Sequence, residues 1–187
     1  MIDVVYDACV LYPAPLRDFL LDIAIAKLAR PHWSDEIHEE WICSLLRDRP
    51  DLNRESLERT RRRMNAKIKN SLTKGYESII PKLRLSDLND RHVLAVAIHT
   101  QSSWIITFNL SDFPKTILQP YEIEAISPDE FVSRLIQKKS DRVLQAAKNH
   151  RSDLTRPPKS VDEYIATLEK QRLPKTVAFL REHKDDL

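Results

Sequence analysis

Acidic side chains occur at four places in this sequence where the local pattern favours an apolar residue. Asp7 ends a short apolar run, and Glu40 lies at the margin of the apolar side of a helical segment. Asp90 heads the apolar side of another helical segment, while Asn109 and Asp112 follow a β-branched and aromatic run. Taken singly, each has an ordinary explanation. Asp7 could begin a turn or cap a helix, and Glu40 could be a solvated glutamate on a helix surface. Asp90 could cap a helix, and the 109–112 segment could be an Asx turn after a strand.

Taken together, these acidic residues share one chemistry if the fold brings them to the same place. Two carboxylates about 4 Å apart repel by a few kcal/mol at an effective dielectric of roughly 20. Either some of them stay protonated or a cation neutralises them. A set of oxygen ligands without cysteine or clustered histidine favours Mg²⁺ or Mn²⁺ over zinc. Because such a site activates water and stabilises the charge that develops on a phosphodiester, we interpret the carboxylates as a metal site.

The elements that must position these residues alternate between strands and helices. Strands are predicted over 2–6, 104–108 and 121–127 from buried or alternating patterns. Helices are predicted between and after them, over residues 16–29, 34–47, 54–70, 90–100 and 128–137. This order indicates an α/β fold with a parallel sheet flanked by helices. Since ligands bind at the carboxyl ends of parallel strands, Asp7 and the residues after 104–108 are expected at one sheet edge.

The start of the 90–100 helix bears directly on the role of Asp90. Ser86, Asp87 and Asn89 precede it and offer caps, so the Asp90 side chain is not needed as one. Asp90 shares the apolar side of the helix, which predicts that it faces inward. His92, on the same helix, points roughly 160° away from Asp90 on a helical projection. We therefore predict a surface position for His92.

The composition narrows the class of protein. The 187-residue chain is 42% hydrophobic, which supplies a core, and its length favours one domain plus an appendage. No apolar run approaches the roughly 20 residues of a membrane span, and no signal-peptide pattern opens the chain, which predicts a cytoplasmic protein without membrane association. The net charge of +2 does not argue for nucleic acid, and the single glycine, Gly75, excludes glycine-rich phosphate loops. Cys9 and Cys43 are predicted to be reduced thiols.

Three stretches of the chain carry a family resemblance. They are, in order, VVYDACVLYP, SDEIHEEW and DLNDRHVLAVAIHTQSSWIITFNLSDFP. Together they resemble the PIN-domain nucleases, and most closely the bacterial branch that includes VapC-like toxins. The resemblance covers about residues 1–137, and the remainder is similar to the C-terminal helices of longer members. It implies a three-layer α/β/α sandwich that cleaves RNA with Mg²⁺ or Mn²⁺ held by three or four acidic residues.

The resemblance also implies roles for particular residues. The implied metal ligands are Asp7, Glu40, Asp90 and Asp112. Family members place Asp or Asn in the fourth slot, so Asn109 is the alternative to Asp112, and Asn109 and Thr107 are expected to position water or metal. Relatives usually have Asn two residues after the first Asp, where this chain has Cys9. This departure could weaken the orientation of the metal without removing a ligand.

A basic run, RTRRRMNAKIKNSLTK over 59–74, contains seven basic residues and no acidic one. A charge run is usually a solvated helix face, but beside a phosphodiester-cleaving site it is a candidate track for the RNA backbone. The candidate RNA-binding residues are Arg17, Arg59, Arg61, Arg62, Arg63 and Lys67.

The function that the resemblance implies is a metal-dependent endoribonuclease acting on RNA, as the toxin of a type II toxin–antitoxin pair. A cognate antitoxin and a homodimer are implied with it. One alternative is a housekeeping RNA-processing nuclease. Another, prompted by Cys9, is a weakened PIN fold that serves as an RNA-binding or interaction module. Along the chain we predict a PIN-like nuclease domain over 1–140 and a helical C-terminal extension over 141–187, where the composition becomes polar and helical.

Overall fold

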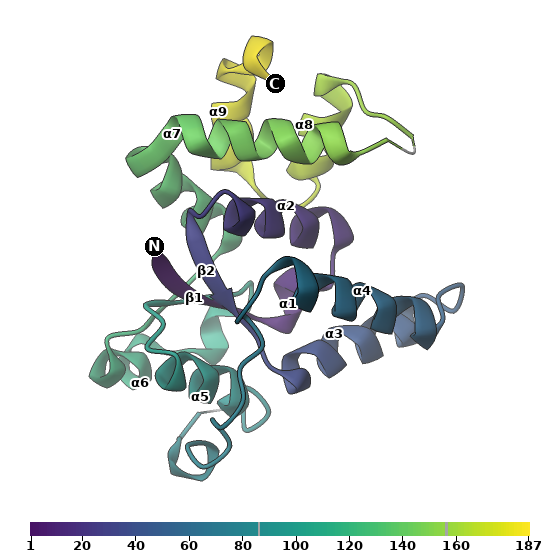
Figure 1. Cartoon of the computed structure of the whole chain (residues 1–187). Helices are drawn as coiled ribbons and strands as arrows, with labels where there is room; N and C mark the ends of the chain where they lie inside the picture. Colours follow the sequence, from purple (N-terminus) through teal and green to yellow (C-terminus); the bar gives the residue numbers. More distant parts are fainter. Residues whose placement is uncertain (86, 156) are drawn as a thin grey trace.

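The computed structural model describes residues 1–85, 87–155 and 157–187. Within these ranges, a parallel sheet of four strands has helices on both faces (Figure 1), which confirms the predicted α/β/α architecture. The strands are β1 (Ile2–Tyr6), β2 (Ala29–His32), β3 (Trp104–Ile106) and β4 (Glu124–Ile126), in the spatial order β2-β1-β3-β4.

Strand β1 lies in the middle of the sheet, where Val5 pairs with His32 of β2 on one side and Ile105 of β3 on the other. Helix α2 (Ala14–Ile25) packs on one face of the sheet, and α5 (Arg91–His99) packs against β1 and β3 on the other. The chain therefore winds outward in both directions from the β1–β3 pair. The carboxyl ends of these two strands form a topological switch point, which is where open α/β sheets bind ligands.

The remaining helices continue these outer layers. They are α1 (Ala8–Leu11), α3 (Asp35–Asp48), α4 (Arg54–Lys67), α6 (Lys115–Leu118), α7 (Pro128–Asp153), α8 (Val161–Glu169) and α9 (Pro174–Glu182), with 3₁₀ turns η1 (Ile80–Lys82), η2 (Leu110–Asp112), η3 (Gln119–Tyr121) and η4 (Lys184–Asp186). None of the helices that the structure describes combines the length and apolar content that a membrane crossing requires.

The structure corrects several predicted boundaries and adds a strand, β2, that the sequence analysis did not predict. The helix predicted over 16–29 ends at Ile25, and Lys27 takes a left-handed conformation with φ 55° before the chain enters β2. Residues in the left-handed conformation commonly end helices, but they are usually glycine or asparagine. A lysine at this position therefore did not predict the end of the helix. Strand β2 contains Pro31 and no β-branched residue, which is tolerated because β2 is an edge strand.

Other ends shift by a few residues. The basic helix stops at Lys67 rather than 70, the second strand stops at Ile106 rather than 108, and the strand predicted over 121–127 is reduced to β4. The candidate cap Ser86 lies outside the described residues. Of the other two candidate caps, Asp87 accepts a hydrogen bond of 2.8 Å from the backbone N–H of Asn89.

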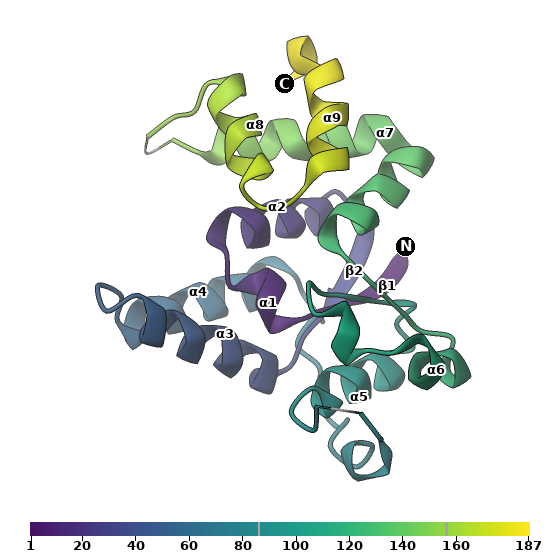
Figure 2. The same ribbon diagram turned by 180° about the vertical axis from the view of Figure 1, so that it is seen from behind.

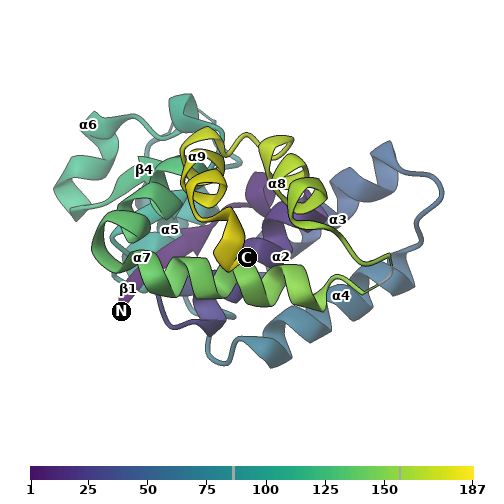
Figure 3. The ribbon, with the colours of Figure 1, turned by 90° about the horizontal axis from the view of Figure 1, so that it is seen from above.

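The C-terminal helices cover α2 on its side away from the sheet. Helix α7 bends at Lys139, which has φ −155° and ψ 54°, and then runs along α2. Helices α8 and α9 pack with it, so that α7, α8 and α9 lie over α2 in both side views (Figures 1 and 2) and from above (Figure 3).

A buried carboxylate joins the two ends of this C-terminal layer. Asp129, in the first turn of α7, is 6% exposed and accepts hydrogen bonds from the backbone N–H groups of Lys175 (3.0 Å) and Thr176 (2.9 Å). The Thr176 hydroxyl donates a third bond, of 2.9 Å. Asp129 therefore caps the first turn of α9 from a different helix.

Replacing Asp129 by alanine is expected to destabilise the folded protein by about 3 kcal/mol, because buried donors lose a charged acceptor. For a chain of this size, that corresponds to a fall of about 6–12 °C in Tm. Thermal unfolding followed by circular dichroism measures it. The control is Asp141→Ala on the exposed side of the same helix, which should stay within about 0.5 kcal/mol of the wild type. Equal losses in the two variants would contradict the capping role.

Candidate functional site

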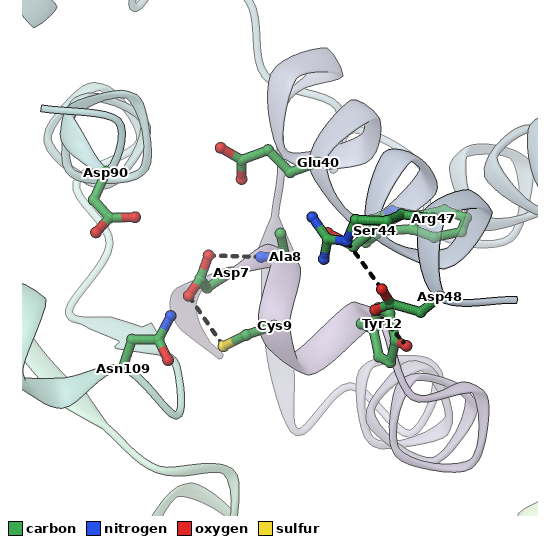
Figure 4. A pocket seen from close by; sticks show the side chains of 11 residues that line it. Asp7, Ala8, Cys9, Tyr12, Glu40, Ser44, Arg47, Asp48, Asp90 and Asn109 are labelled. Carbon is green, nitrogen blue, oxygen red and sulfur yellow. Dashed lines mark hydrogen bonds and ion pairs between the residues drawn. The ribbon is translucent and has the colours of Figure 1, made fainter. Parts of the chain in front are cut away.

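A cleft of about 430 Å³ opens at the carboxyl ends of β1 and β3, at the predicted sheet edge. Figure 4 shows that side chains from α1, α3, the start of α5 and the turn after β3 point into it. One end of the cleft is acidic and contains Asp7, Glu40, Asp90 and the amide of Asn109; the other end contains Tyr12, Ser44, Arg47 and Asp48. The fold thus brings together residues from each of the four predicted segments.

Asp7 lies at the floor of the cleft and is 4% exposed. Its Oδ1 atom accepts a 2.6 Å hydrogen bond from the backbone N–H of Ala8, so the side chain caps α1. Its Oδ2 atom accepts a 2.6 Å bond from the Thr107 hydroxyl, which follows β3. The same carboxylate therefore caps a helix, as one of the two predictions had it, and also lines the cleft. Burial raises the pKa of Asp7, the charge of Glu40 adds to this rise, and the hydrogen bonds oppose it.

Cys9 also holds the Asp7 carboxylate. Its thiol donates to Oδ2 of Asp7 at 3.1 Å, and its sulfur accepts from the backbone N–H of Phe108 at 3.2 Å. Burial, followed by the charge of Asp7, raises the pKa of the Cys9 thiol to about 12, so the thiol keeps the proton that it donates. Cys9, in α1, thus links Asp7 to the turn after β3. Cys9 and Cys43 are both free thiols.

Glu40 projects from α3, and its Oε1 atom accepts a 2.8 Å hydrogen bond from Nε2 of His92. The surface position predicted for His92 is wrong, because this side chain is only 3% exposed. A helical projection assumes one solvent side, whereas residues 92–97 of α5 are buried all round. Burial by itself lowers the pKa of His92, but the bond to Glu40 and the charges of Glu40, Glu36 and Asp7 outweigh it and raise this pKa.

Asp90 occupies the N-cap position of α5, yet among the described residues its side chain makes no capping hydrogen bond. The carboxylate instead faces the cleft opposite Glu40 and Asp7 (Figure 4). Burial, and then the charges of Asp7, Asp87, Asp112 and Glu40, raise the pKa of Asp90 to about 6. The acidic side chains are therefore close enough to act on one another electrostatically.

The two candidates for the fourth slot lie in different places. Asn109 lines the cleft, and its backbone N–H donates a 2.9 Å bond to the hydroxyl of Thr107. Asp112, in η2, is half-buried and is not among the described residues that line the cleft, although its charge acts on Asp90. In the part of the chain that the structure describes, no three His, Cys, Asp or Glu side chains stand close enough together to enclose a metal ion directly.

The predicted basic residues lie elsewhere. Arg17 is 7% exposed, donates to the carbonyl of Leu11 and lies over the ring of Trp41, so it is a packed residue. None of the basic side chains that the structure describes on α4 lines the acidic cleft; Arg59, Arg61 and Lys67 form ion pairs with acidic neighbours, and Arg62 and Arg63 are exposed.

Among the described residues, Arg47 is the basic residue that lines the cleft, and the sequence reasoning missed it. It lies two helical turns after Glu40, on the same side of α3, with Ser44 between them. This spacing is the signal in the sequence that could have identified it.

The raised pKa of Asp90 has a consequence for the stability of the metal-free protein. A carboxyl group with a raised pKa stabilises the folded state most below its ordinary pKa of 3.8, and this contribution is lost as the pH rises through about 6. Urea unfolding between about pH 4 and about pH 7 should therefore show that Asp90→Asn gains stability relative to the wild type as the pH rises. Parallel pH profiles for the two proteins would contradict the electrostatic account.

Comparison with known proteins gives independent information. The family model described as "PIN domain" matches residues 3–111, and the model described as "VapC50 C-terminal domain" matches residues 128–182. A protein of Mycobacterium tuberculosis named "Putative ribonuclease VapC50" is 41% identical over 58 residues, which are 31% of this chain and 34% of that protein. The match thus spans about a third of the length of this relative. No solved structure matches the chain.

Proposed function

This chain belongs to the PIN-domain family, and we propose that it is a divalent-metal-dependent endoribonuclease that hydrolyses phosphodiester bonds in RNA. The observation that carries the proposal is the convergence of Asp7, Glu40 and Asp90 on one cleft at the switch point of the sheet. These three carboxylates come from three separate segments, and the pKa of Asp90 rises through burial and, after that, through nearby negative charges that include Asp7 and Glu40. A protein that had no use for this charge would gain from apolar or neutral residues at these positions.

The donor set fits Mg²⁺ or Mn²⁺. It consists of carboxylate oxygens and the Asn109 amide, and the sulfur nearby is occupied as a protonated donor to Asp7. Direct enclosure by three side chains is not required, because Mg²⁺ keeps several waters and takes only one or two protein carboxylates directly. When bound, such an ion lowers the pKa of water and stabilises the charge that develops on a phosphodiester.

The residues of the chain have distinct parts in this proposal. Asp7, held by Thr107 and Cys9, and Glu40, held by His92, present oriented carboxylates to the cleft, and Asp90 faces them. Asp112 adds negative potential that acts on Asp90 and completes the acidic set.

At the margins of the acidic set, two further side chains contribute. Asn109 lines the cleft beside Asp7 and orients water or metal there. Arg47, at the other end, carries a side chain that can contact a phosphate of an RNA strand lying along the cleft, a contact that positions the strand without reading its sequence.

We propose further that the enzyme is the toxin of a type II toxin–antitoxin pair that acts in the cytoplasm. The support is the match to a C-terminal domain named after VapC50, together with the related protein of that name. A cognate antitoxin and a homodimer are part of this proposal, as is the division into a nuclease domain over 1–140 and a helical extension over 141–187.

The test is direct. The purified chain, incubated with 5′-labelled single-stranded RNA, should produce internal cleavage products in Mg²⁺ or Mn²⁺. RNA that stays intact in both Mg²⁺ and Mn²⁺ would contradict the proposed nuclease activity. For the toxin, induced expression should arrest growth, and co-expression of the neighbouring gene should relieve the arrest. Arrest that no neighbouring gene relieves would favour a housekeeping nuclease.

A further inference from the structure

We propose that His92 is a positioning residue that fixes the Glu40 carboxylate toward the acidic cleft. This inference rests on the proposed function, because it assigns a role within the same site. His92 lies on α5, two residues after Asp90, and its ring reaches α3, where Nε2 is 2.8 Å from Oε1 of Glu40. A single hydrogen bond therefore joins the two helices that carry Glu40 and Asp90.

Glu40 needs such a partner because its side chain is mobile by nature. Its side chain is 37% exposed, and a glutamate on a helix surface loses substantial rotamer freedom when it is held in one orientation. Asp7 has the shorter side chain and is held by Ala8, Cys9 and Thr107. Hydrogen bonds to a metal-binding carboxylate orient it before the metal arrives, which is how residues behind a site raise its affinity.

The surroundings of His92 argue against a role in packing alone. Its Nδ1 atom is buried without a hydrogen-bond partner among the described residues, and the nearest carboxylate oxygen, Oε2 of Glu36, is 3.8 Å away. Glu36 lies one turn before Glu40 on α3 and accepts a 3.3 Å bond from the hydroxyl of Tyr76. Both ring nitrogens thus face carboxylates of α3. A leucine would fill this space, but it could neither donate to Glu40 nor present a ring nitrogen to Glu36.

The chain offers a matched control in its C-terminal layer. His150, on α7, is also 3% exposed, and it also has one buried ring nitrogen without a partner in the described part of the chain. Its other nitrogen is 3.1 Å from the hydroxyl of Tyr164 on α8, and its ring packs on Phe19. His150 is therefore equivalent in burial, but its partner Tyr164, unlike Glu40, is not among the described residues that line the cleft.

The experiment compares His92→Leu, His92→Gln and His150→Leu with the wild type. Calorimetric titration with Mn²⁺ and the kcat and KM values for RNA cleavage are the readouts, with Tm as a check on folding. His92→Leu should weaken Mn²⁺ binding by about 10- to 100-fold and lower kcat, with KM for RNA nearly unchanged. His92→Gln places an amide N–H near the position of Nε2 and should restore most of the affinity. His150→Leu should change Tm without changing Mn²⁺ affinity.

Two results would overturn the inference: wild-type Mn²⁺ affinity in His92→Leu, or equal losses in the Leu and Gln variants, which would indicate packing. If the wild-type protein neither binds Mn²⁺ nor cleaves RNA, the proposed function is wrong, but the contact between His92 and Glu40 can still be tested. The positioning contact is then read in the metal-free protein by NMR. Slow solvent exchange of the His92 ring N–H that becomes fast in Glu40→Ala supports the contact, and exchange that Glu40→Ala leaves unchanged refutes it.

Discussion

Replacing Asp7 by asparagine is expected to lower the rate of RNA cleavage by on the order of 10³-fold. Asparagine has the shape of aspartate but not its charge, so the substitution removes the proposed metal ligand with little change in packing. Charge stabilisation by a bound metal is worth several kcal/mol. Each 1.36 kcal/mol lost from transition-state stabilisation slows a reaction tenfold, which gives the expected magnitude.

The same substitution is expected to raise the stability of the metal-free protein at neutral pH. Burial raises the pKa of Asp7, and the charge of Glu40 adds to this rise, so the ionised carboxylate is disfavoured in the folded state. This contribution to stability is present at low pH and is lost as the pH rises, so a neutral asparagine avoids the loss. A less active but more stable Asp7→Asn variant would separate a functional carboxylate from a structural one.

The measurements are initial rates on labelled RNA in Mn²⁺ and Tm in the absence of metal, both at neutral pH. Asp141→Asn, on the exposed side of α7, is the control and should match the wild type in both. Cleavage by Asp7→Asn at the wild-type rate would show that Asp7 is only the cap of α1.

Removal of divalent cations is expected to abolish cleavage, and Mn²⁺ is expected to restore it. Burial and then the charges of the neighbouring carboxylates raise the pKa of Asp90, so the ionised cleft is electrostatically unfavourable, and a bound cation relieves this. At a concentration 100 times its Kd, a ligand stabilises the folded state by about 2.7 kcal/mol. For a protein of this size, Mn²⁺ should therefore raise Tm by about 5–10 °C.

The assay compares EDTA-treated protein with and without added Mn²⁺, in rate and in Tm. Asp90→Asn should show a smaller Tm shift with Mn²⁺ than the wild type, because it lacks one carboxylate. Cleavage that persists in EDTA and is unaffected by Mn²⁺ would mean that the acidic cleft is not a metal site. RNA binding without a Tm shift and without cleavage would favour the interaction-module alternative.

Much of the site could be anticipated because its signals are local. A strand that ends in an aspartate places that residue at the carboxyl edge of a parallel sheet, and Asp7 lies there. Helix periodicity placed Glu40 beside the apolar side of α3 and Asp90 at the head of α5, and both face the cleft. Their role as metal ligands remains a prediction.

Other features depended on contacts that no local pattern contains. The residues of strand β2 carry no strand pattern of their own. They form a strand because their backbone groups hydrogen-bond to β1. His92 is buried because other parts of the fold cover every side of α5, and a helical projection of one segment cannot represent that.

The basic residues, and the choice between Asn109 and Asp112, also depended on contacts between distant segments. A run of basic residues identified α4 as charged, but the direction in which α4 packs keeps it out of the cleft, whereas Arg47 enters because α3 already presents Glu40 there. Asn109 rather than Asp112 lines the cleft because η2 turns the chain between them.

Apart from β2, the order of strands and main helices, the parallel sheet and the edge at which acidic residues gather were thus determined by sequence pattern, because periodicity and strand ends are properties of short segments. Which of those residues meet, which are covered and which histidine holds Glu40 was decided by tertiary packing, because each requires two segments distant in the chain to lie within a few ångströms of one another.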